Sequence, residues 1–363
     1  MTVFKTLPKN DGFRMPAEFE PHAGTILIWP FRGDSWPYGG DRAQAVFAKL
    51  VSLISESEQT LVCVPEREYE KARAALPPGT ELFIVETDDS WARDYAPTFV
   101  TDGKTLRGIN WKFNAWGGTY DGLYDSWEND DALAPKLCAH LHCDEYDAHH
   151  IVMEGGAFHT DGQGTVITTE SCLLSPGRNP KLSKDAIEEA LLSYLGAEKV
   201  IWLPSGIIDD ETNGHVDNIC AFTSPGNVVL ARPLDIDDPQ YASSSRAYDI
   251  LLRETDAKGQ PLNIHILPMP KPVLVTKYQC DGLDLLKGEP VRTPGERLAA
   301  SYANFYISNS TVIVPGFDDP ADEAARLVIA ELFPDRKVVT LQSREVLIGG
   351  GNFHCLTQQI PRL

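Results

Sequence analysis

The sequence predicts an α/β domain that spans residues 1–363 and repeats one structural unit five times. The first observation is that one order of elements recurs: an amphipathic helix, a short apolar strand, then a polar or glycine-rich loop. The second is that two of the strands, Lys199–Leu203 and Lys337–Leu341, have nearly the same sequence. The third is that no long linker or low-complexity stretch separates the units. Together these observations favour pseudo-fivefold repetition within one closed domain.

Helices are predicted where apolar residues recur every three or four positions. In segment 184–195, Ile187, Leu191 and Tyr194 share one face, Ser183 can cap the start and Gly196 suits the end. The other predicted helices cover residues 41–57, 66–76, 131–141, 240–255 and 320–333. In the last helix, the expected apolar stripe consists of Ala324, Leu327, Val328 and Leu332.

Strands are predicted where short apolar runs are bounded by turn residues. Those that follow the helices cover residues 81–85, 150–153, 199–203, 263–267 and 337–341. Further apolar strands precede several helices, at 165–168, 227–230 and 311–314. The helix at 41–57 is expected in the unit that closes the repeat.

Composition limits the partners of the chain. The formal net charge of -20 argues against nucleic acid, because phosphate contacts need clustered Lys and Arg. An acidic surface can attract a small cation, although it also serves solubility. No apolar run approaches the roughly 20 residues that span a bilayer, and the first residues do not resemble a signal peptide. Seven scattered cysteines suit a reducing compartment, so we expect a cytoplasmic protein away from membranes; a homo-oligomer is compatible with the sequence.

Four of the five loops that follow the strands carry reactive or charged side chains. They contain Asp94, Glu154, the acidic run 209–217 with His215, and the run 348–355 that ends at Cys355. Units arranged around an axis would bring these loops together in one pocket. Each feature also has a structural explanation: buried cysteines often act as small apolar residues, and Asp94 could pair with the adjacent Arg93.

The loop residues suit chemistry on a guanidinium. In a strand, His215 and Asp217 would point to the same face and could form an acid/base unit. Several carboxylates suit a guanidinium, whose N–H donors match their oxygens in pairs. A thiolate of Cys355 could attack the guanidinium carbon while His215 protonates the departing nitrogen, giving a covalent amidino intermediate that water resolves to a ureido product.

Motifs across the chain resemble the agmatine deiminase family, whose guanidine-modifying relatives share a five-bladed α/β-propeller, the pentein fold. They lie at residues 29–30, 89–94, 113–118, 153–156, 177–180, 210–218 and 349–361. The resemblance implies hydrolysis of agmatine to N-carbamoylputrescine and ammonia, without a metal or an organic cofactor. It also implies that Cys355 is the nucleophile and His215 the acid/base, with Asp94, Glu154 and Asp217 holding the guanidinium.

Further residues are expected to contact the substrate. Trp91 and Trp116 would line the pocket, Glu211 would bind the distal ammonium, and Gly350 and Gly351 would let a flat substrate approach the nucleophile.

Alternative functions stay open at this point. A deiminase of free or peptidyl arginine, or an amidinotransferase, would use the same intermediate, and Arg93 could then bind a substrate carboxylate. An acidic repeat scaffold would need no thiol chemistry. A zinc site is the weakest alternative, because its ligands have irregular spacing: Cys138, His140, His142, Cys143, His149 and His150.

Overall fold

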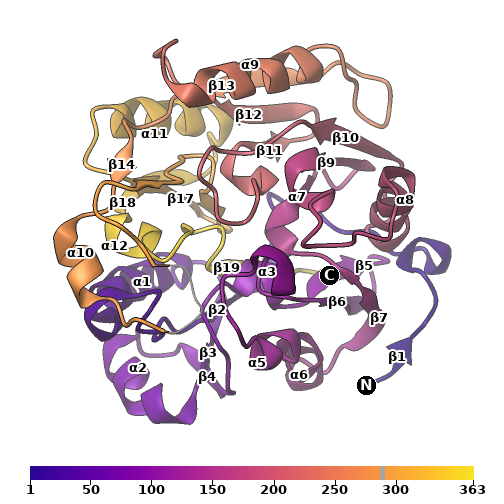
Figure 1. The fold of residues 1–363 in the computed structure, drawn as a ribbon. Helices are drawn as coiled ribbons and strands as arrows, with labels where there is room; N and C mark the ends of the chain where they lie inside the picture. Colours follow the sequence, from indigo (N-terminus) through magenta and orange to yellow (C-terminus); the bar gives the residue numbers. More distant parts are fainter. Residues whose placement is uncertain (287–290) are drawn as a thin grey trace.

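Five similar sheets surround a common centre in the computed structural model, which describes residues 1–286 and 291–363 (Figure 1). We call each sheet a blade and its first strand the lead strand. In every blade, the lead strand is antiparallel to the second strand, which is parallel to the third. This recurring pattern confirms the predicted fivefold repetition.

Blades one to four follow the chain in order. Their strands are β5 (Thr98–Thr101), β6 (Leu106–Lys112) and β7 (Asp144–Val152); β8 (Phe158–Thr160), β9 (Thr165–Thr169) and β10 (Lys199–Leu203); β11 (Cys220–Ser224), β12 (Asn227–Ala231) and β13 (Asn263–Leu267); β16 (Tyr306–Ile307), β17 (Thr311–Gly316) and β18 (Lys337–Gln342). A small pair, β14 (Val273–Leu274) and β15 (Arg297–Leu298), lies between blades three and four in sequence.

Blade five joins the two ends of the chain. Its lead strand is β19 (Thr357–Pro361), which pairs with β2 (His22–Ile28) and is followed in the sheet by β3 (Gln59–Val64) and β4 (Glu81–Ile84). In the antiparallel register, Thr357 lies opposite Leu27. The short strand β1 (Val3–Phe4) adds to the edge of β7 in blade one. The lead strand that follows Cys355 is therefore fixed by the N-terminal part of the chain.

Helices connect the parallel strands and lie around the outside of the molecule (Figure 1). The longer ones are α1 (Asp41–Ile54), α2 (Tyr69–Ala75), α6 (Leu133–His140), α8 (Lys184–Tyr194), α9 (Pro239–Leu251) and α11 (Ala321–Leu332). As predicted, α1 belongs to the closing blade. In α8, the Ser183 side chain accepts a hydrogen bond from the Ala186 N–H, and Gly196 follows with a φ of 63°. The predicted face of α8 is buried.

Some predicted bounds and faces are wrong. Strand β7 begins at Asp144 instead of residue 150, because its outward side chains are polar and hide the alternation with buried Tyr146 and Ala148. Segment 66–76 divides into a 3₁₀ turn, η3 (Glu66–Glu68), and α2. Helix α9 ends at Leu251, not residue 255. In α11 the buried positions are Ala325 and Ile329, whereas Leu327 is 50% exposed.

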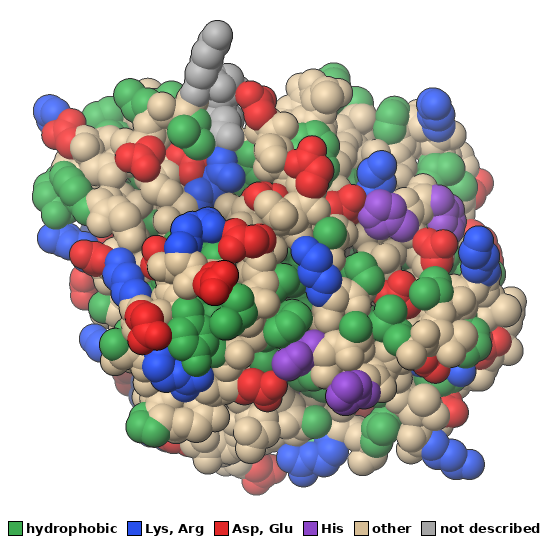
Figure 2. Space-filling model, turned by 90° about the horizontal axis from the view of Figure 1, so that it is seen from below, with side chains coloured by type: hydrophobic (Ala, Val, Ile, Leu, Met, Phe, Trp, Pro, Cys, Tyr) green, Lys and Arg blue, Asp and Glu red, His purple; other side chains and the backbone are tan. Residues whose placement is uncertain are grey.

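Buried apolar residues form three clusters that each draw on neighbouring blades. Within the described residues, no helix is both long and apolar enough to cross a bilayer. On the face seen in Figure 2, Lys and Arg side chains of the described residues are scattered among Asp and Glu. The arrangement leaves the centre of the blades to polar side chains, which build the site.

Candidate active site

One polar side chain comes from the turn before each lead strand. The five are Asp94 before β5, Glu154 before β8, His215 before β11, Asn304 before β16 and Cys355 before β19. Each turn contacts the next. The first two contacts join Gly156 N to Asp94 Oδ1 at 2.9 Å and His215 Nε2 to Glu154 Oε2 at 3.9 Å. Asn304 Nδ2 then lies 3.0 Å from Asn218 Oδ1 and 3.1 Å from Cys355 Sγ, and Arg93 N closes the ring at 3.1 Å from Cys355 O. The expected convergence of the loops is therefore real, and it includes a fifth loop that the sequence did not reveal.

His215 lies between two carboxylates. Its Nδ1 is 3.8 Å from Asp94 Oδ1, and its Nε2 faces Glu154. Burial lowers the pKa of His215, but the charge of Asp94 and contacts with Cys172 and Glu154 outweigh burial and hold that pKa well above its ordinary value. Within the described residues, Glu154, Cys172 and His215 each place one atom of a kind that can bind a metal ion within 4.8 Å of the other two. His215 is thus placed as a buried, protonated imidazolium.

Gly156 makes this arrangement possible. A Cβ at this position would lie 2.6 Å from His215 Nδ1, 2.9 Å from Asp94 Oδ1 and 3.0 Å from Asp217 Oδ2. Any side chain there would push the histidine and two carboxylates apart. Gly156, the second residue after Glu154, is therefore where three functional groups meet.

The prediction that His215 and Asp217 lie on a strand is wrong. They belong to a turn, because Gly214 takes a φ of 94° and Val216–Asn218 form the 3₁₀ helix η5. Both side chains nevertheless approach the space beside Gly156. Sharing a turn, instead of a strand face, brings them to the same site.

Arg178 fixes Glu154 from behind. Its Nε donates to Glu154 Oε1 at 2.8 Å, and both side chains are fully buried. The guanidinium also donates to the carbonyls of Trp116 and Thr212 and to the Asn213 side chain. Burial raises the pKa of Glu154, but the Arg178 charge and His215 outweigh burial, so that pKa is lowered overall. Glu154 is held ionised with one oxygen toward His215.

Cys355 lies close to carboxylates and an amide. Its Sγ is 3.5 Å from Asp217 Oδ2 and 3.1 Å from Asn304 Nδ2. Burial and the negative charges of Asp217 and Asp94 raise the pKa of the Cys355 thiol well above its ordinary value, against hydrogen bonds from Asn352 and Asn304. In the unliganded protein, the sulfur is therefore a thiol.

An inner cavity adjoins Cys355 and encloses about 320 Å³ of empty space, part of it open to solvent. The residues that line it are Trp91, Asp94, Trp116, Leu123, Glu211, Thr212, Asn218, Gly349, Gly350, Gly351 and Cys355. The Trp116 Nε1–H donates to Asp94 Oδ2 at 2.9 Å. A Cβ on Gly351 would lie 2.7 Å from the Trp91 ring and 2.9 Å from Cys355 Cβ. The glycine-rich loop thus packs flat against the wall that carries the thiol.

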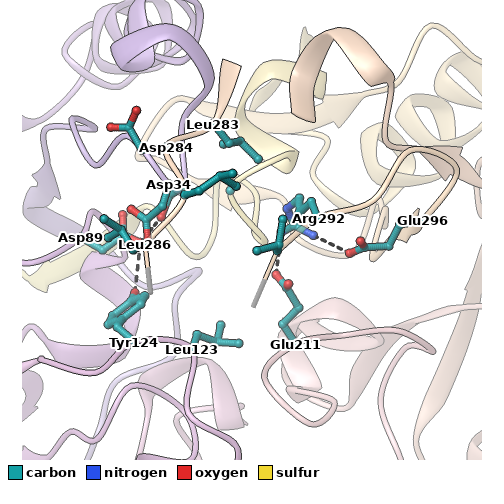
Figure 3. A pocket seen from close by; sticks show the side chains of 14 residues that line it. Asp34, Asp89, Leu123, Tyr124, Glu211, Leu283, Asp284, Leu286, Arg292 and Glu296 are labelled. Carbon is teal, nitrogen blue, oxygen red and sulfur yellow. Dashed lines mark hydrogen bonds and ion pairs between the residues drawn. The ribbon is translucent and has the colours of Figure 1, made fainter. Parts of the chain in front are cut away.

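A larger outer cavity of about 700 Å³ shares Leu123, Glu211 and Gly349 with the inner one. Figure 3 shows Glu211 and Arg292 paired on one side of it. The ion pair has an N–O distance of 2.6 Å. The outer cavity therefore leads to the inner one, and Glu211 stands where they join, already paired with an arginine.

One expected substrate contact does not match these positions. Arg93 does not line the inner cavity: it is 1% exposed and its guanidinium lies 3.1 Å from Glu18. Of the zinc candidates, His140 pairs with Glu81 and His149 with Asp131, whereas Cys138 and Cys143 contact each other. Four further residues contact the site and were not assigned from sequence: Glu18, Arg178, Asn304 and His354. Arg178 and His354 lie within the recognised motifs, whereas Glu18 and Asn304 carry no local signal.

Sequence comparison matches residues 14–361 to the Porphyromonas-type peptidyl-arginine deiminase family. The chain belongs to this family. It is 53% identical over 369 residues to a candidate agmatine deiminase of Selenomonas ruminantium, with 100% of each chain covered. It superposes on the agmatine deiminase of Enterococcus faecalis with a TM-score of 0.97, 44% identity and 99% of each chain covered.

A more distant structure shows the fold alone. DDAH from Pseudomonas aeruginosa is 10% identical and matches with a TM-score of 0.50 over 94% of this chain and 100% of that one. Together with the blade pattern, this likeness identifies the fold as the five-bladed α/β-propeller, or pentein. The fold expected from the resemblance is confirmed.

Proposed function

We propose that this protein hydrolyses agmatine to N-carbamoylputrescine and ammonia through a covalent intermediate on Cys355. The observation that carries the proposal is the placement of Cys355 beside Asp217 and Asn304 at the wall of a cavity that also contains Asp94. The high identity to agmatine deiminases over the full chain supports the same reaction.

The carboxylates hold the guanidinium of the substrate. Asp94, Glu154 and Asp217 are buried: Asp94 and Asp217 each bring an oxygen beside Gly156, and Glu154 faces His215. Their oxygens can accept the N–H donors of a planar guanidinium in pairs, which fixes its carbon in front of the sulfur. The bound cation also offsets the negative charges that oppose ionisation of the thiol.

The reaction then proceeds in two halves. The thiol loses its proton to solvent, and the Cys355 sulfur bonds to the guanidinium carbon to give a neutral tetrahedral adduct. His215 gives a proton to one terminal nitrogen, which leaves as ammonia, and a positively charged amidino-cysteine remains. The neutral His215 next takes a proton from water, whose oxygen bonds to the same carbon. Collapse breaks the C–S bond, returns the hydroxyl proton to sulfur and releases the product, whose ureido group is neutral.

The lining of the inner cavity favours an amine-ended substrate over arginine. Among the described residues that line it, none carries a basic side chain, so a substrate carboxylate would lack a cationic partner. Arg93 is engaged by Glu18, and Arg292 beside the outer cavity is engaged by Glu211 and Glu296. Glu211 remains our candidate for the distal ammonium, which would compete with Arg292 for its carboxylate.

Ammonia release from agmatine, free arginine and an arginine-containing peptide tests the proposal. We expect a higher kcat/KM for agmatine, and loss of ammonia release in the Cys355→Ser variant. The matched control is Cys280→Ser, since Cys280 is half-buried and lies outside the inner cavity. Preference for arginine would refute the substrate, and an active Cys355→Ser variant would refute the nucleophile. Transfer of the amidino group to an added amine without ammonia would instead indicate an amidinotransferase.

Other expectations stay predictions: one domain, a cytoplasmic location, no nucleic-acid partner, no cofactor, and a homo-oligomer as a compatible state.

A further inference from the structure

A row of four buried charged side chains lies beneath the proposed nucleophile: Asp217, His354, Glu18 and Arg93. His354 Nδ1 is 2.8 Å from Asp217 Oδ2, the oxygen that faces Cys355 Sγ at 3.5 Å. On its other side, His354 Nε2 is 2.8 Å from Glu18 Oε1, and Arg93 lies 3.1 Å from the same Glu18 oxygen. All four side chains are at most 4% exposed. This row of charges therefore runs from the carboxylate that faces the thiol into the centre of the blades.

The contacts of His354 determine its protonation. Ionised carboxylates only accept hydrogen bonds, so a ring that bonds to a carboxylate through each nitrogen must carry a proton on both. Glu18 is ionised because Arg93 pairs with it. His159 offers a contrast within the same cluster: its Nδ1 accepts from the Phe222 N–H at 3.3 Å, and its Nε2 faces Glu18 at 3.5 Å. His159 thus approaches the same glutamate through one nitrogen only, whereas both nitrogens of His354 face carboxylates.

The charges in this row balance. Asp217 and Glu18 contribute two negative charges, and His354 and Arg93 contribute two positive charges. Buried charges are tolerated when they are paired with opposite charges. Asp217 is consequently stabilised as an anion by a cation that does not occupy the substrate's place.

On the basis of the proposed function, we propose that His354 and Glu18 are positioning residues of the reaction. His354 is a permanent imidazolium that keeps Asp217 ionised and directs one of its oxygens to Cys355 and the substrate. Glu18, anchored by Arg93, keeps His354 protonated and fixes its ring. Neither residue touches the substrate, and both act through Asp217.

The electrostatics of the two groups agree with this geometry. Burial raises the pKa of Asp217, but the hydrogen bond and charge of His354, with His215 and Arg93, outweigh burial and lower it. Burial and the Arg93 charge lower the pKa of His354, while Glu18 and Asp217 outweigh both and raise it. The neighbouring His159 stacks on His354 with ring centroids 5.9 Å apart. Loss of His354 should therefore let Asp217 take up a proton at higher pH.

Three variants test the proposal kinetically. A hydrogen bond to a buried charge contributes enough that His354→Leu should lower kcat/KM for agmatine about 10- to 150-fold. In His354→Leu, Asp217 should titrate in addition to Asp94, so the acidic limb of the kcat/KM profile should also move to higher pH. His354→Asn retains a donor for Asp217 and should recover much of the loss, whereas Glu18→Gln should lie between wild type and His354→Leu. Equal impairment of both His354 variants with an unmoved acidic limb would overturn the proposal.

A second readout needs no turnover. In ¹⁵N-imidazole NMR of the wild-type protein at neutral pH, the His354 signals, assigned by their absence from His354→Asn, should show both nitrogens protonated. In Glu18→Gln, His354 should become neutral at lower pH than in wild type. A neutral His354 in wild type would overturn the proposal even if agmatine were not the substrate.

His22→Leu is the matched control. His22 forms another buried pair, with Glu58 at 3.4 Å. Its ring contacts Glu18 only at the main-chain carbonyl and not at the carboxylate. Its loss should lower the Tm without moving the acidic limb. A shifted limb in His22→Leu would show that general loosening of the centre accounts for the effect.

Discussion

Replacing Arg178 with leucine should strand a charge in the centre of the protein. Arg178 and Glu154 are both fully buried, so removal of the cation leaves an uncompensated carboxylate. Breaking such a pair from one side costs about 3–5 kcal/mol. With an unfolding entropy of roughly 2.1 cal/mol/K per residue, a chain of 363 residues loses about 4–7 °C of Tm, measurable by calorimetry at pH 7.

The pH dependence of the Tm identifies the stranded Glu154 charge as the cause of the lost stability. In the wild type, the lowered pKa of Glu154 contributes stability that is present above its unfolded pKa and lost as the pH falls through the folded pKa. Without Arg178, burial dominates and raises that pKa, so Glu154 takes up a proton in mild acid. The Tm difference should then shrink between pH 8 and pH 5.5.

A double variant and a surface control complete the experiment. Adding Glu154→Gln to Arg178→Leu removes the stranded charge and should restore part of the stability, but not activity. The control is Arg326→Leu, whose partner Glu323 is 64% exposed; because solvent screens this pair, its loss should leave the Tm nearly unchanged. A Tm difference independent of pH, or a double variant equal to the sum of the single ones, would refute the reasoning.

Two other predictions concern catalysis. Burial, with Asp217 and Glu154 adding to it and His215 opposing it, raises the pKa of Asp94 to about 6, so kcat/KM should fall as pH drops through about 6. Asp94→Asn should lack that limb in a pH–rate profile. The raised pKa also affects stability: protonated Asp94 favours the folded state, and its contribution to the free energy of unfolding is lost as the pH rises through about 6. Gly156→Ala should displace His215 and cost about 100-fold in kcat/KM with the circular dichroism unchanged; full activity would show that the site has room to adjust.

The blades were predictable because their signals are local. In α8, the cap at Ser183, the buried face and the stop at Gly196 lie within one short window. Helix α11 was harder, because apolar residues occupy two adjoining faces and only packing decides that Ala325 and Ile329 point inward. Strand β7 was shortened in prediction because a strand with one polar side has no continuous apolar run.

The site was predictable where reactive residues follow a strand directly. Asn304 escaped notice because a long connection through β14, α10 (Lys277–Gly282) and β15 separates it from β13. Glu18 lies outside every repeated loop, and only the closed fold brings it to His354. Arg93 was misplaced because adjacency does not give direction: in the one-turn helix α3 (Ala92–Tyr95), Asp94 faces the cavity and Arg93 faces Glu18.

Two carboxylates beside the nucleophilic thiol oppose its ionisation, and this opposition affects when the thiol can react. Asp94 and Asp217 help raise the pKa of Cys355 well above its ordinary value, which keeps the empty site unreactive. A guanidinium between them cancels their effect: at about 4 Å and an effective dielectric of about 20, a unit charge contributes roughly 4 kcal/mol, or about three pKa units. The substrate would thus generate the nucleophile that attacks it, and formation of the neutral ureido group would restore the thiol.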